Sequence, residues 1–528
     1  MLSSRTTEPS HPLVTWAAVA IGATFTIPGW LVLWRAFRLD VGLDTVWTDL
    51  RAPLWRTIQL ATLVSATAAV VGTGLAWLLV RTDLPLRRMW RLVLVLPLGL
   101  PSFVGAAAFI AGVSPDGLLH EVLGWVGITP PRRLRGLGIS WLVLTAFTYP
   151  YVLLPVSARL LALRPSLDES ARLLGRGPVA TFVSVTLPQL RSAIVGGSLL
   201  VYLYCVSEFG AVQLLGYDTL TRVVFATRLA DRATSFGAAA VLLVLAIAVV
   251  SLERWQRGPA TIDERAGRAV TPSVTLGWKA VPATLACATV ALVGLVTPVA
   301  SLALWAQRGL ADGRVDLGDL VQPAWNTAVV SVTTAIVAVA VVVPVAVTTT
   351  QRRSRLGDVS AGSVVVGFAL PGLVIALALT VVTLNTPVLN SLYQTTALLV
   401  FAYVVHFGSQ ALASVEQSLR AVPGQLRESS RLLDASAIRR IWRVDAPLMR
   451  PGLLAGAGLV LLSTVKELPA TLLLAPTGFS TLATKVWGSY EDGFYAEAGA
   501  GSIALIVLSG VLTWFLVLRR SALVATKQ

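Results

Sequence analysis

Residues 169–175 read Glu-Ser-Ala-Arg-Leu-Leu-Gly, and residues 428–434 read Glu-Ser-Ser-Arg-Leu-Leu-Asp, 259 positions further along the chain. Three later landmarks keep the same offset: Val185 with Val444, Pro188 with Pro447, and Glu208 with Glu467. A repeat that holds one register over this distance indicates an internal duplication, and a duplication decides the architecture before any single motif is weighed.

The repeat extends upstream at a slightly larger offset. Thr57 and Thr327 stand at the start of matching apolar blocks, and Pro101 and Pro371 lie inside the next block of each copy. A change in loop length is enough to explain the difference. The two copies therefore span most of the chain.

The composition indicates whether these apolar blocks lie in water or in a lipid bilayer. Hydrophobic residues make up 55% of the 528 residues and charged residues only 13%, whereas soluble domains carry about a quarter charged residues. Many of the apolar blocks approach the roughly 20 residues that a helix needs to cross the hydrocarbon core of a bilayer. The chain is predicted to be an all-α polytopic membrane protein.

Twelve spans are predicted, six in each copy. They cover about Leu13–Trp34, Ile58–Val80, Leu92–Ala111, Leu137–Val156, Ala193–Leu215, Ala238–Leu252, Val281–Trp305, Thr327–Val347, Ser363–Leu384, Ala397–Leu412, Leu453–Leu474 and Ser502–Leu518. We expect a first half at 1–252 with its core at about 55–252, a cytoplasmic linker at 253–280, and a second half at 281–528 with its core at about 325–519. Prolines inside several spans indicate kinked or broken helices.

The net charge of +15 does not indicate a nucleic-acid-binding protein, because the arginines flank apolar blocks and do not gather on one polar face. Their alternation between connections fits the positive-inside rule and predicts that both termini are cytoplasmic. Arg132, Arg133 and Arg135 depart from the rule and are placed outside. They are either a docking site for an acidic external protein or a tolerated charge cluster.

The repeated segment predicts a helix–turn–helix on the cytoplasmic face. Ser166 and Glu169 have the spacing of a capping box, Gly175 is suited to a left-handed helix end, and Pro178 suits the first turn of a second short helix. The apolar side chains of this element, Leu167, Leu174 and Phe182, need a protein surface to cover them.

Glu169-Ser170-Ala171, Gly175, Val185 and Leu187-Pro188 together resemble the "EAA" loop of binding-protein-dependent ABC importer permeases. The resemblance implies the type I importer permease fold in a bacterial cytoplasmic (plasma) membrane, two copies of a separate ATPase subunit that holds ATP and Mg, and an external substrate-binding protein. It assigns ATPase coupling to Glu169, Ser170, Ala171, Gly175, Leu187 and Pro188, and in the second copy to Glu428, Ser429, Ser430, Asp434 and Pro447. The second copy departs from the pattern, with Asp434 at the glycine position. The alternative is a pair of charged linkers that only fix topology.

A narrower resemblance covers Lys466–Thr484, which is similar to the fused two-domain permeases for ferric iron. Its partner in the first half, Ser207–Ala211, is similar to the same group and to thiamine permeases. The resemblance implies ferric iron as the cargo, with thiamine, phosphonates or polyamines as alternatives, and places most of the selectivity in the external binding protein.

Glu208 and Glu467 are predicted to lie within spans, where a carboxylate is costly unless it is paired, buried in the bundle or in a wet cavity. Lys466 is the expected charge partner of Glu467. The two carboxylates either line the translocation pathway or form a symmetric structural pair.

No catalytic residues are predicted. None of the four lysines follows a glycine, so the phosphate-binding loop of an ATPase is missing, and no His/Cys cluster has the spacing of a metal site. The alternative class is a secondary transporter with two parallel six-span halves, driven by an ion gradient. The repeated cytoplasmic loop favours the ATP-driven importer, because a secondary transporter has no ATPase subunit to bind.

Overall fold

The structure is a computed structural model, and the residues it describes are 12–42, 44, 46–125, 127, 129, 133–163, 173–175, 177–256, 274–350, 355–422 and 446–513. These residues are predominantly helical. Within the described ranges β-pairing is limited to one isolated bridge, between Thr82 and Val274.

The long helices of the first half are α1 (Pro12–Arg38), α3 (Arg51–Arg81), α7 (Leu137–Thr148) continued by α8 (Pro150–Ala162), α11 (Leu187–Ser207) and α14 (Arg232–Gln256). Its shorter elements are η1 (Val46–Leu50), α4 (Arg87–Val93), η2 (Leu96–Gly99), α5 (Ser102–Val113), α6 (Leu118–Trp125), α10 (Pro178–Thr181), η3 (Phe182–Thr186), α12 (Gly210–Leu214) and α13 (Leu220–Thr227).

The second half repeats this order. Its long helices are α15 (Ala280–Ala291) continued through η5 (Leu292–Val296) by α16 (Thr297–Ala311), α17 (Val321–Thr350), α20 (Thr396–Ala421), α23 (Ala446–Val465) and α26 (Tyr495–Thr513). Its shorter elements are η4 (Gly277–Lys279), η6 (Leu317–Leu320), α18 (Arg355–Ala369), α19 (Gly372–Asn385), η7 (Pro387–Leu392), α24 (Pro469–Leu474) and α25 (Leu482–Glu491).

The order of the predicted spans is confirmed, and their number lies between ten and twelve. Within the described residues, ten helical segments are long and apolar enough to cross a membrane, and two bent helix pairs bring the number to twelve if each pair is one crossing. The bent pairs are the third crossing of each half, and they turn by 96° and 100°.

The predicted third spans, Leu92–Ala111 and Ser363–Leu384, are therefore not continuous helices. Pro101 and Pro371 have extended backbone and directly precede α5 and α19. Proline cannot donate a backbone hydrogen bond and suits the start of a new helix better than a helix interior. The prolines that marked the repeat mark the same break in both halves.

The predicted fifth and eleventh spans, Ala193–Leu215 and Leu453–Leu474, are also interrupted. The helix α11 ends at Ser207 and α23 ends at Val465, and each is followed by a short helix, α12 or α24, after a break. The apolar composition of the sequence runs through these breaks, so hydropathy alone did not locate them.

A pair of hydrogen bonds shows the duplication in space. The backbone N–H of Leu220, at the start of α13, donates to the Thr57 hydroxyl at 3.0 Å. The backbone N–H of Leu482, at the start of α25, donates to the Thr327 hydroxyl at 2.9 Å. The two threonines that opened matching blocks of the sequence thus hold matching helices.

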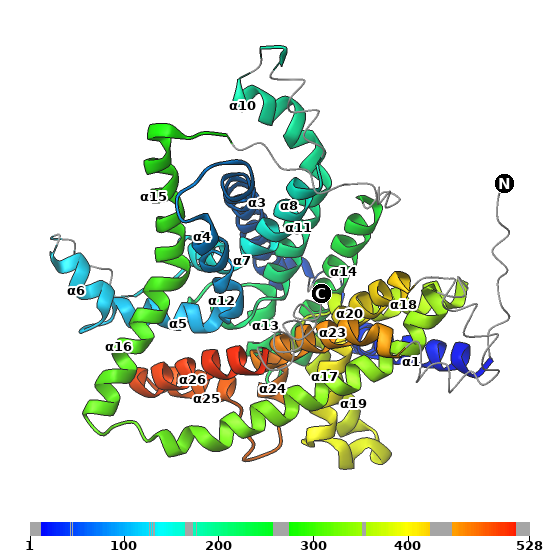
Figure 1. The fold of residues 1–528 in the computed structure, drawn as a ribbon. Helices are drawn as coiled ribbons and strands as arrows, with labels where there is room; N and C mark the ends of the chain where they lie inside the picture. Colours follow the sequence, from blue (N-terminus) through cyan, green and yellow to red (C-terminus); the bar gives the residue numbers. More distant parts are fainter. Residues whose placement is uncertain are drawn as a thin grey trace, which may run out of the picture.

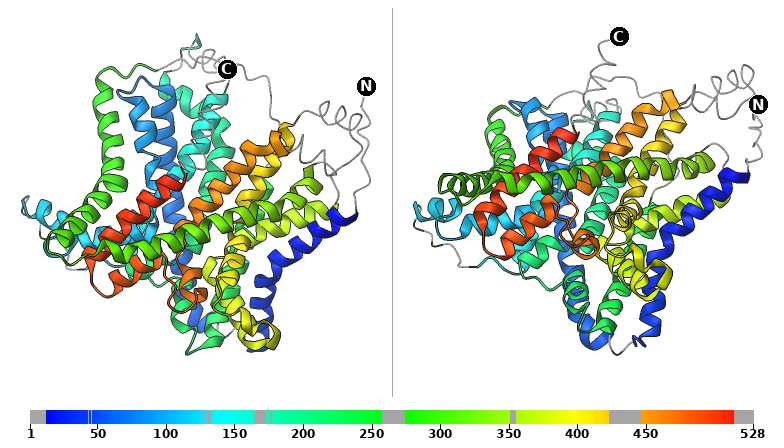
Figure 2. Two further views of the ribbon diagram at one scale, coloured as in Figure 1. Left: turned by 60° about the horizontal axis from the view of Figure 1, so that its bottom comes forward. Right: turned by 90° about the horizontal axis from the view of Figure 1, so that it is seen from below.

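The first long helix of each half crosses to the other half. The helix α1 packs mainly against α18 and α17 of the second half, and α16 packs against α5 of the first half as well as against α26. In Figure 1, α1 (dark blue) lies among the second-half helices, and α15 and α16 (green) lie beside α4, α5 and α6. Figure 2 shows the same exchange from two other directions. This exchange was not predicted, because hydropathy does not show which helix a span contacts.

Phe25 is a buried contact of α1 in this exchange. Its side chain is 1% exposed and lies against Gly408 of α20, where an added methyl group would come within 2.6 Å of the ring. We expect Phe25→Ala to destabilise the folded chain by about 3 kcal/mol, the usual cost of removing a buried aromatic ring. Thermal unfolding of the purified protein measures this loss.

Phe37 is the matched control on the same helix, because its side chain is 81% exposed. Phe37→Ala should leave the unfolding temperature close to that of the unmodified protein. Equal destabilisation by the two variants would contradict the assignment of Phe25 as a contact that joins the halves.

Candidate functional site

The two glutamates predicted to lie within spans are located at the two helix breaks. The Glu208 Oε1 atom accepts a hydrogen bond from the backbone N–H of Ala211 at 2.8 Å. The Glu467 Oε1 atom accepts one from the backbone N–H of Ala470 at 2.9 Å. Each carboxylate is thus bound to the first turn of the following short helix, where free N–H groups need an acceptor. The side chains are 8% and 7% exposed.

In the first half the second carboxylate oxygen of Glu208 reaches the other helix break. The Ser102 hydroxyl, at the start of α5, donates to Glu208 Oε2 at 2.7 Å, and the Tyr204 hydroxyl donates to the Ser102 hydroxyl at 3.0 Å. The carboxylate therefore joins the break of the third crossing to the break of the fifth.

In the second half, other residues contact the Glu467 carboxylate and donate hydrogen bonds to it. Gly372 occupies the position of Ser102, and a methyl group added to it would lie 2.8 Å from Glu467 Oε1. The Glu467 Oε2 atom accepts hydrogen bonds from the Thr471 hydroxyl at 3.0 Å and from the Thr471 backbone N–H at 3.2 Å. The glycine allows close approach, and the threonine replaces the hydroxyl that Ser102 supplies in the first half.

Lys466 does not form the expected ion pair with Glu467. Its ammonium group donates to the backbone carbonyl oxygen of Leu98, in η2 of the first half, at 3.0 Å. No ion pair to Glu467 occurs in the part of the chain that the structure describes. The break in the third crossing leaves backbone carbonyl groups without a helical donor, and inside a membrane such groups need another donor. This explains why Lys466 binds the Leu98 carbonyl oxygen. Lys466 thus links the two halves.

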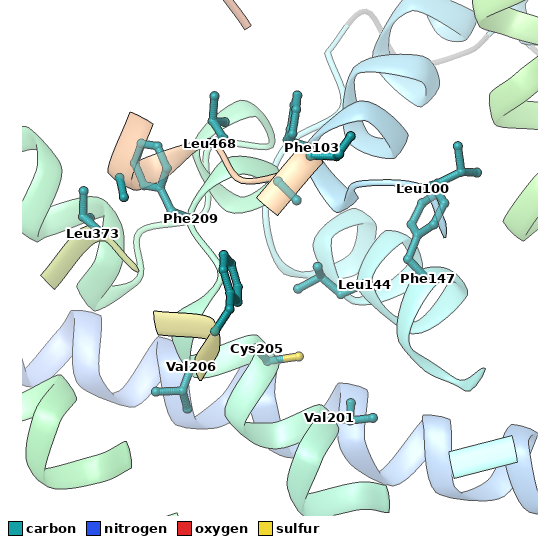
Figure 3. Close-up of a cluster of buried hydrophobic side chains, with 14 of the residues drawn as sticks. Leu100, Phe103, Leu144, Phe147, Val201, Cys205, Val206, Phe209, Leu373 and Leu468 are labelled. Atoms are coloured by element: carbon teal, nitrogen blue, oxygen red, sulfur yellow. The ribbon is translucent and has the colours of Figure 1, made fainter. Parts of the chain in front are cut away.

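An aromatic cluster closes the space between the two breaks. The rings of Phe103 and Trp487 lie 6.4 Å apart, and those of Phe209 and Trp487 lie 5.7 Å apart. Figure 3 shows Phe103, Phe209 and Leu468 among the buried apolar side chains of this region. Trp487 and Leu468 belong to the second half and the two phenylalanines to the first, so the halves meet here through apolar side chains.

The first of the two predicted coupling loops is described in part. Gly175 has φ of +81°, the left-handed conformation expected of a helix end, and α10 begins at Pro178 as predicted. Leu173 and Leu174 are 88% and 82% exposed. Phe182, expected on the same uncovered side, instead packs against Trp77 with a ring separation of 5.8 Å.

The remaining residues predicted to couple to the ATPase fall into two groups. Leu187 and Pro188 open α11, and Pro447 is likewise the second residue of α23, so the two loops lead into matching helices. The others lie outside the described residues: Glu169, Ser170, Ala171, Glu428, Ser429, Ser430 and Asp434.

The structure describes two of the three arginines predicted on the outside. Arg133 and Arg135 are exposed, and Arg132 lies outside the described residues. The Arg135 side chain lies over Gly216, at the turn that follows α12. It therefore adjoins the segment that leads from the Glu208 break to α13.

Sequence reasoning missed the hydroxyl donors of this site, Ser102, Tyr204 and Thr471. The alignment of Pro101 with Pro371 carried a signal for the first, because the next residue is Ser102 in one half and Gly372 in the other. Among the described residues no group of three His, Cys, Asp or Glu side chains is arranged to hold a metal ion.

Among the described residues, ten to twelve crossings in two copies, with a broken third crossing joined by hydrogen bonds or close contact to a broken fifth, define a duplicated polytopic membrane protein. The chain belongs to the family described as binding-protein-dependent transport system inner membrane component, which matches residues 68–257 and again 336–523. It is a permease subunit of an ABC importer.

The chain is similar to the Fe(3+)-transport system permease protein FbpB 2 of Haemophilus influenzae, with 29% identity over 517 residues, 95% of this chain and 97% of the relative. It is also similar to the molybdenum transport system permease protein ModB of Escherichia coli K12, with 29% identity over 41% of this chain and 98% of that protein. The sulfate transport system permease protein CysW of the same strain is 28% identical over 39% of this chain and 72% of its own length. The iron permease matches both copies, whereas the other two match a length of about one copy.

Proposed function

We propose that this permease imports ferric iron that an external binding protein delivers. The observation that carries the proposal is the similarity to an Fe(3+) permease along 95% of this chain. The relatives named for molybdenum and sulfate have only one copy's length in common with it. They make oxyanion import the second candidate.

Two ATPase subunits, each holding ATP and Mg, bind the two cytoplasmic loops in this proposal. The exposed Leu173 and Leu174, next to a glycine-ended turn, support it for the first loop, because an apolar pair on a cytoplasmic loop needs a protein to cover it. The matching positions of Pro188 and Pro447 support one ATPase subunit for each half. Both termini then lie in the cytoplasm of a bacterial cell.

The glutamates act as structural anchors in this proposal and do not carry iron. Their oxygens accept hydrogen bonds from backbone N–H groups and hydroxyls, and an oxygen engaged in this way is a poor metal ligand. During alternating access the break of the third crossing and the break of the fifth crossing in each half then move together, because the carboxylate connects the two crossings.

The decisive experiment identifies the cargo. The external binding protein is purified, its retained ligand is measured, and uptake of radioactive iron is followed in vesicles that contain this chain and its ATPase. ATP-dependent iron uptake that requires the loaded binding protein supports the proposal. Retention of molybdate or sulfate would establish the second candidate, and uptake by the chain alone under a proton gradient would contradict ATP-driven import.

A further inference from the structure

We propose that two turns of opposite charge on the outer face fix the orientation in which the binding protein docks. The first elbow is defined as residues 215–235, which connect α12 to α14 through α13. The second elbow is defined as residues 475–497, which connect α24 to α26 through α25. The inference rests on the proposed function, which places both elbows outside and supplies the binding protein as the partner.

The first elbow is basic on its exposed side. It carries Arg222, Arg228 and Arg232, and Arg135 lies over its first turn. Arg228 is held over the Phe225 ring at 3.7 Å, and Arg232 is exposed at the start of α14.

The acidic residues of the first elbow are already engaged. Asp218 pairs with Arg222 and with Arg56, the latter at 3.0 Å. Asp231 accepts hydrogen bonds from the Thr234 backbone N–H and hydroxyl at 3.1 and 2.6 Å, which lower the pKa of its carboxyl and keep it ionised. The arginines of the first elbow, together with Arg135, outnumber Asp218 and Asp231, so the net charge offered to a partner is positive.

The second elbow contains a pocket of about 520 Å³ with a negative rim. Asp492, Glu497 and Lys485 line it together with Phe494. Lys485 and Glu497 are paired at 3.5 Å, and the Ser489 hydroxyl donates to Glu497 at 3.1 Å. Asp492 has no ion pair among the residues that the structure describes.

The backbone holds this rim in place. Gly493 has φ of +83°, and the Phe494 backbone N–H donates to the Ser489 carbonyl oxygen at 2.8 Å. This is the Schellman arrangement that ends a helix through a left-handed glycine. It presents Asp492 and the 57% exposed Phe494 at the pocket without cost to the fold.

The two elbows have matching positions in the fold, but this match does not require them to differ in charge. Thr219 and Thr481, which precede the helices held by Thr57 and Thr327, set the register of the two elbows. In that register the charged positions do not match: Arg222 with Thr484, Arg228 with Tyr490, Arg232 with Phe494, Leu229 with Glu491, Ala230 with Asp492, and Ser235 with Glu497.

Two surfaces in matching positions of the two halves and of opposite charge can distinguish the two ends of a partner. The binding protein is therefore expected to place a basic patch over the second elbow and an acidic patch over the first. Like charges would meet in the reversed orientation, which suppresses that complex. A pocket beside an exposed phenylalanine suits the long apolar stem and charged head of an arginine or lysine.

The test measures binding of the purified binding protein to the permease–ATPase complex in lipid nanodiscs. We expect Asp492→Lys and, separately, Arg232→Glu to weaken binding about tenfold at low salt, with a smaller effect at high salt. Asp116→Lys is the matched control, because Asp116 is exposed between α5 and α6, on an outer segment of the first half that belongs to neither elbow. It makes the same charge change and should leave binding unchanged.

Orientation is tested by cross-linking. Asp492→Cys and Arg232→Cys are each labelled with a photoreactive maleimide, since Cys205 and Cys287 are buried and should not react. The two labels should capture opposite ends of the binding protein. Capture of the same end by both labels, or unchanged binding in both charge variants, would overturn the inference. If the unmodified complex binds no binding protein, the proposed function itself fails.

Discussion

Leu174→Glu is expected to reduce ATP-dependent transport at least tenfold while the permease remains folded. Leu174 is 82% exposed beside the turn at Gly175, and in the proposed complex it is covered by an ATPase subunit. Burying a carboxylate against an apolar partner surface costs about 2 kcal/mol or more, which corresponds to about thirtyfold weaker association. Co-purification of the ATPase and uptake into vesicles measure the two effects.

Leu229→Glu provides the matched control for this prediction. Leu229 is 79% exposed, but it lies on the first elbow, at the other end of the crossing that α11 begins. The same substitution there should leave ATPase association unchanged. Full ATPase binding by Leu174→Glu would contradict the coupling role of the first loop, and the companion variant Leu433→Glu would show whether the second loop contributes equally.

Glu467→Ala is expected to lower the stability of the permease by about 3 kcal/mol. The substitution leaves the backbone N–H groups of Ala470 and Thr471 without their acceptor, and each buried unsatisfied group costs about 1–3 kcal/mol. In a membrane no bulk water replaces the lost acceptor. The yield of folded protein and the midpoint of thermal unfolding measure the loss.

Glu467→Gln separates the structural role from a role in the pathway. Glutamine keeps one acceptor oxygen, so it should retain more stability than alanine and most of the transport activity. Glu491→Ala is the control, because Glu491 is exposed and should tolerate the change. A Gln variant that folds normally but does not transport would contradict the anchor role and favour a carboxylate in the pathway.

The sequence by itself determined the class of fold and the duplication. Apolar blocks about as long as a membrane-crossing helix and two copies in one register predicted twelve crossings, and the described residues hold ten to twelve in the same order. Local chemistry was also readable: the turn at Gly175 and the start of α10 at Pro178 follow from the φ angles that these residues prefer.

Tertiary structure alone decided where the spans break and what the charged residues bind. A hydropathy average hides single residues such as Glu208 and Glu467, so it does not locate the breaks. In the structure each carboxylate accepts a hydrogen bond from a backbone N–H group at the start of a new helix, which marks the break. Lys466 bonds to Leu98 across the two halves, a residue far away in the sequence. Local spacing cannot predict a partner of this kind, because the partner is brought near only by the packing of the other half.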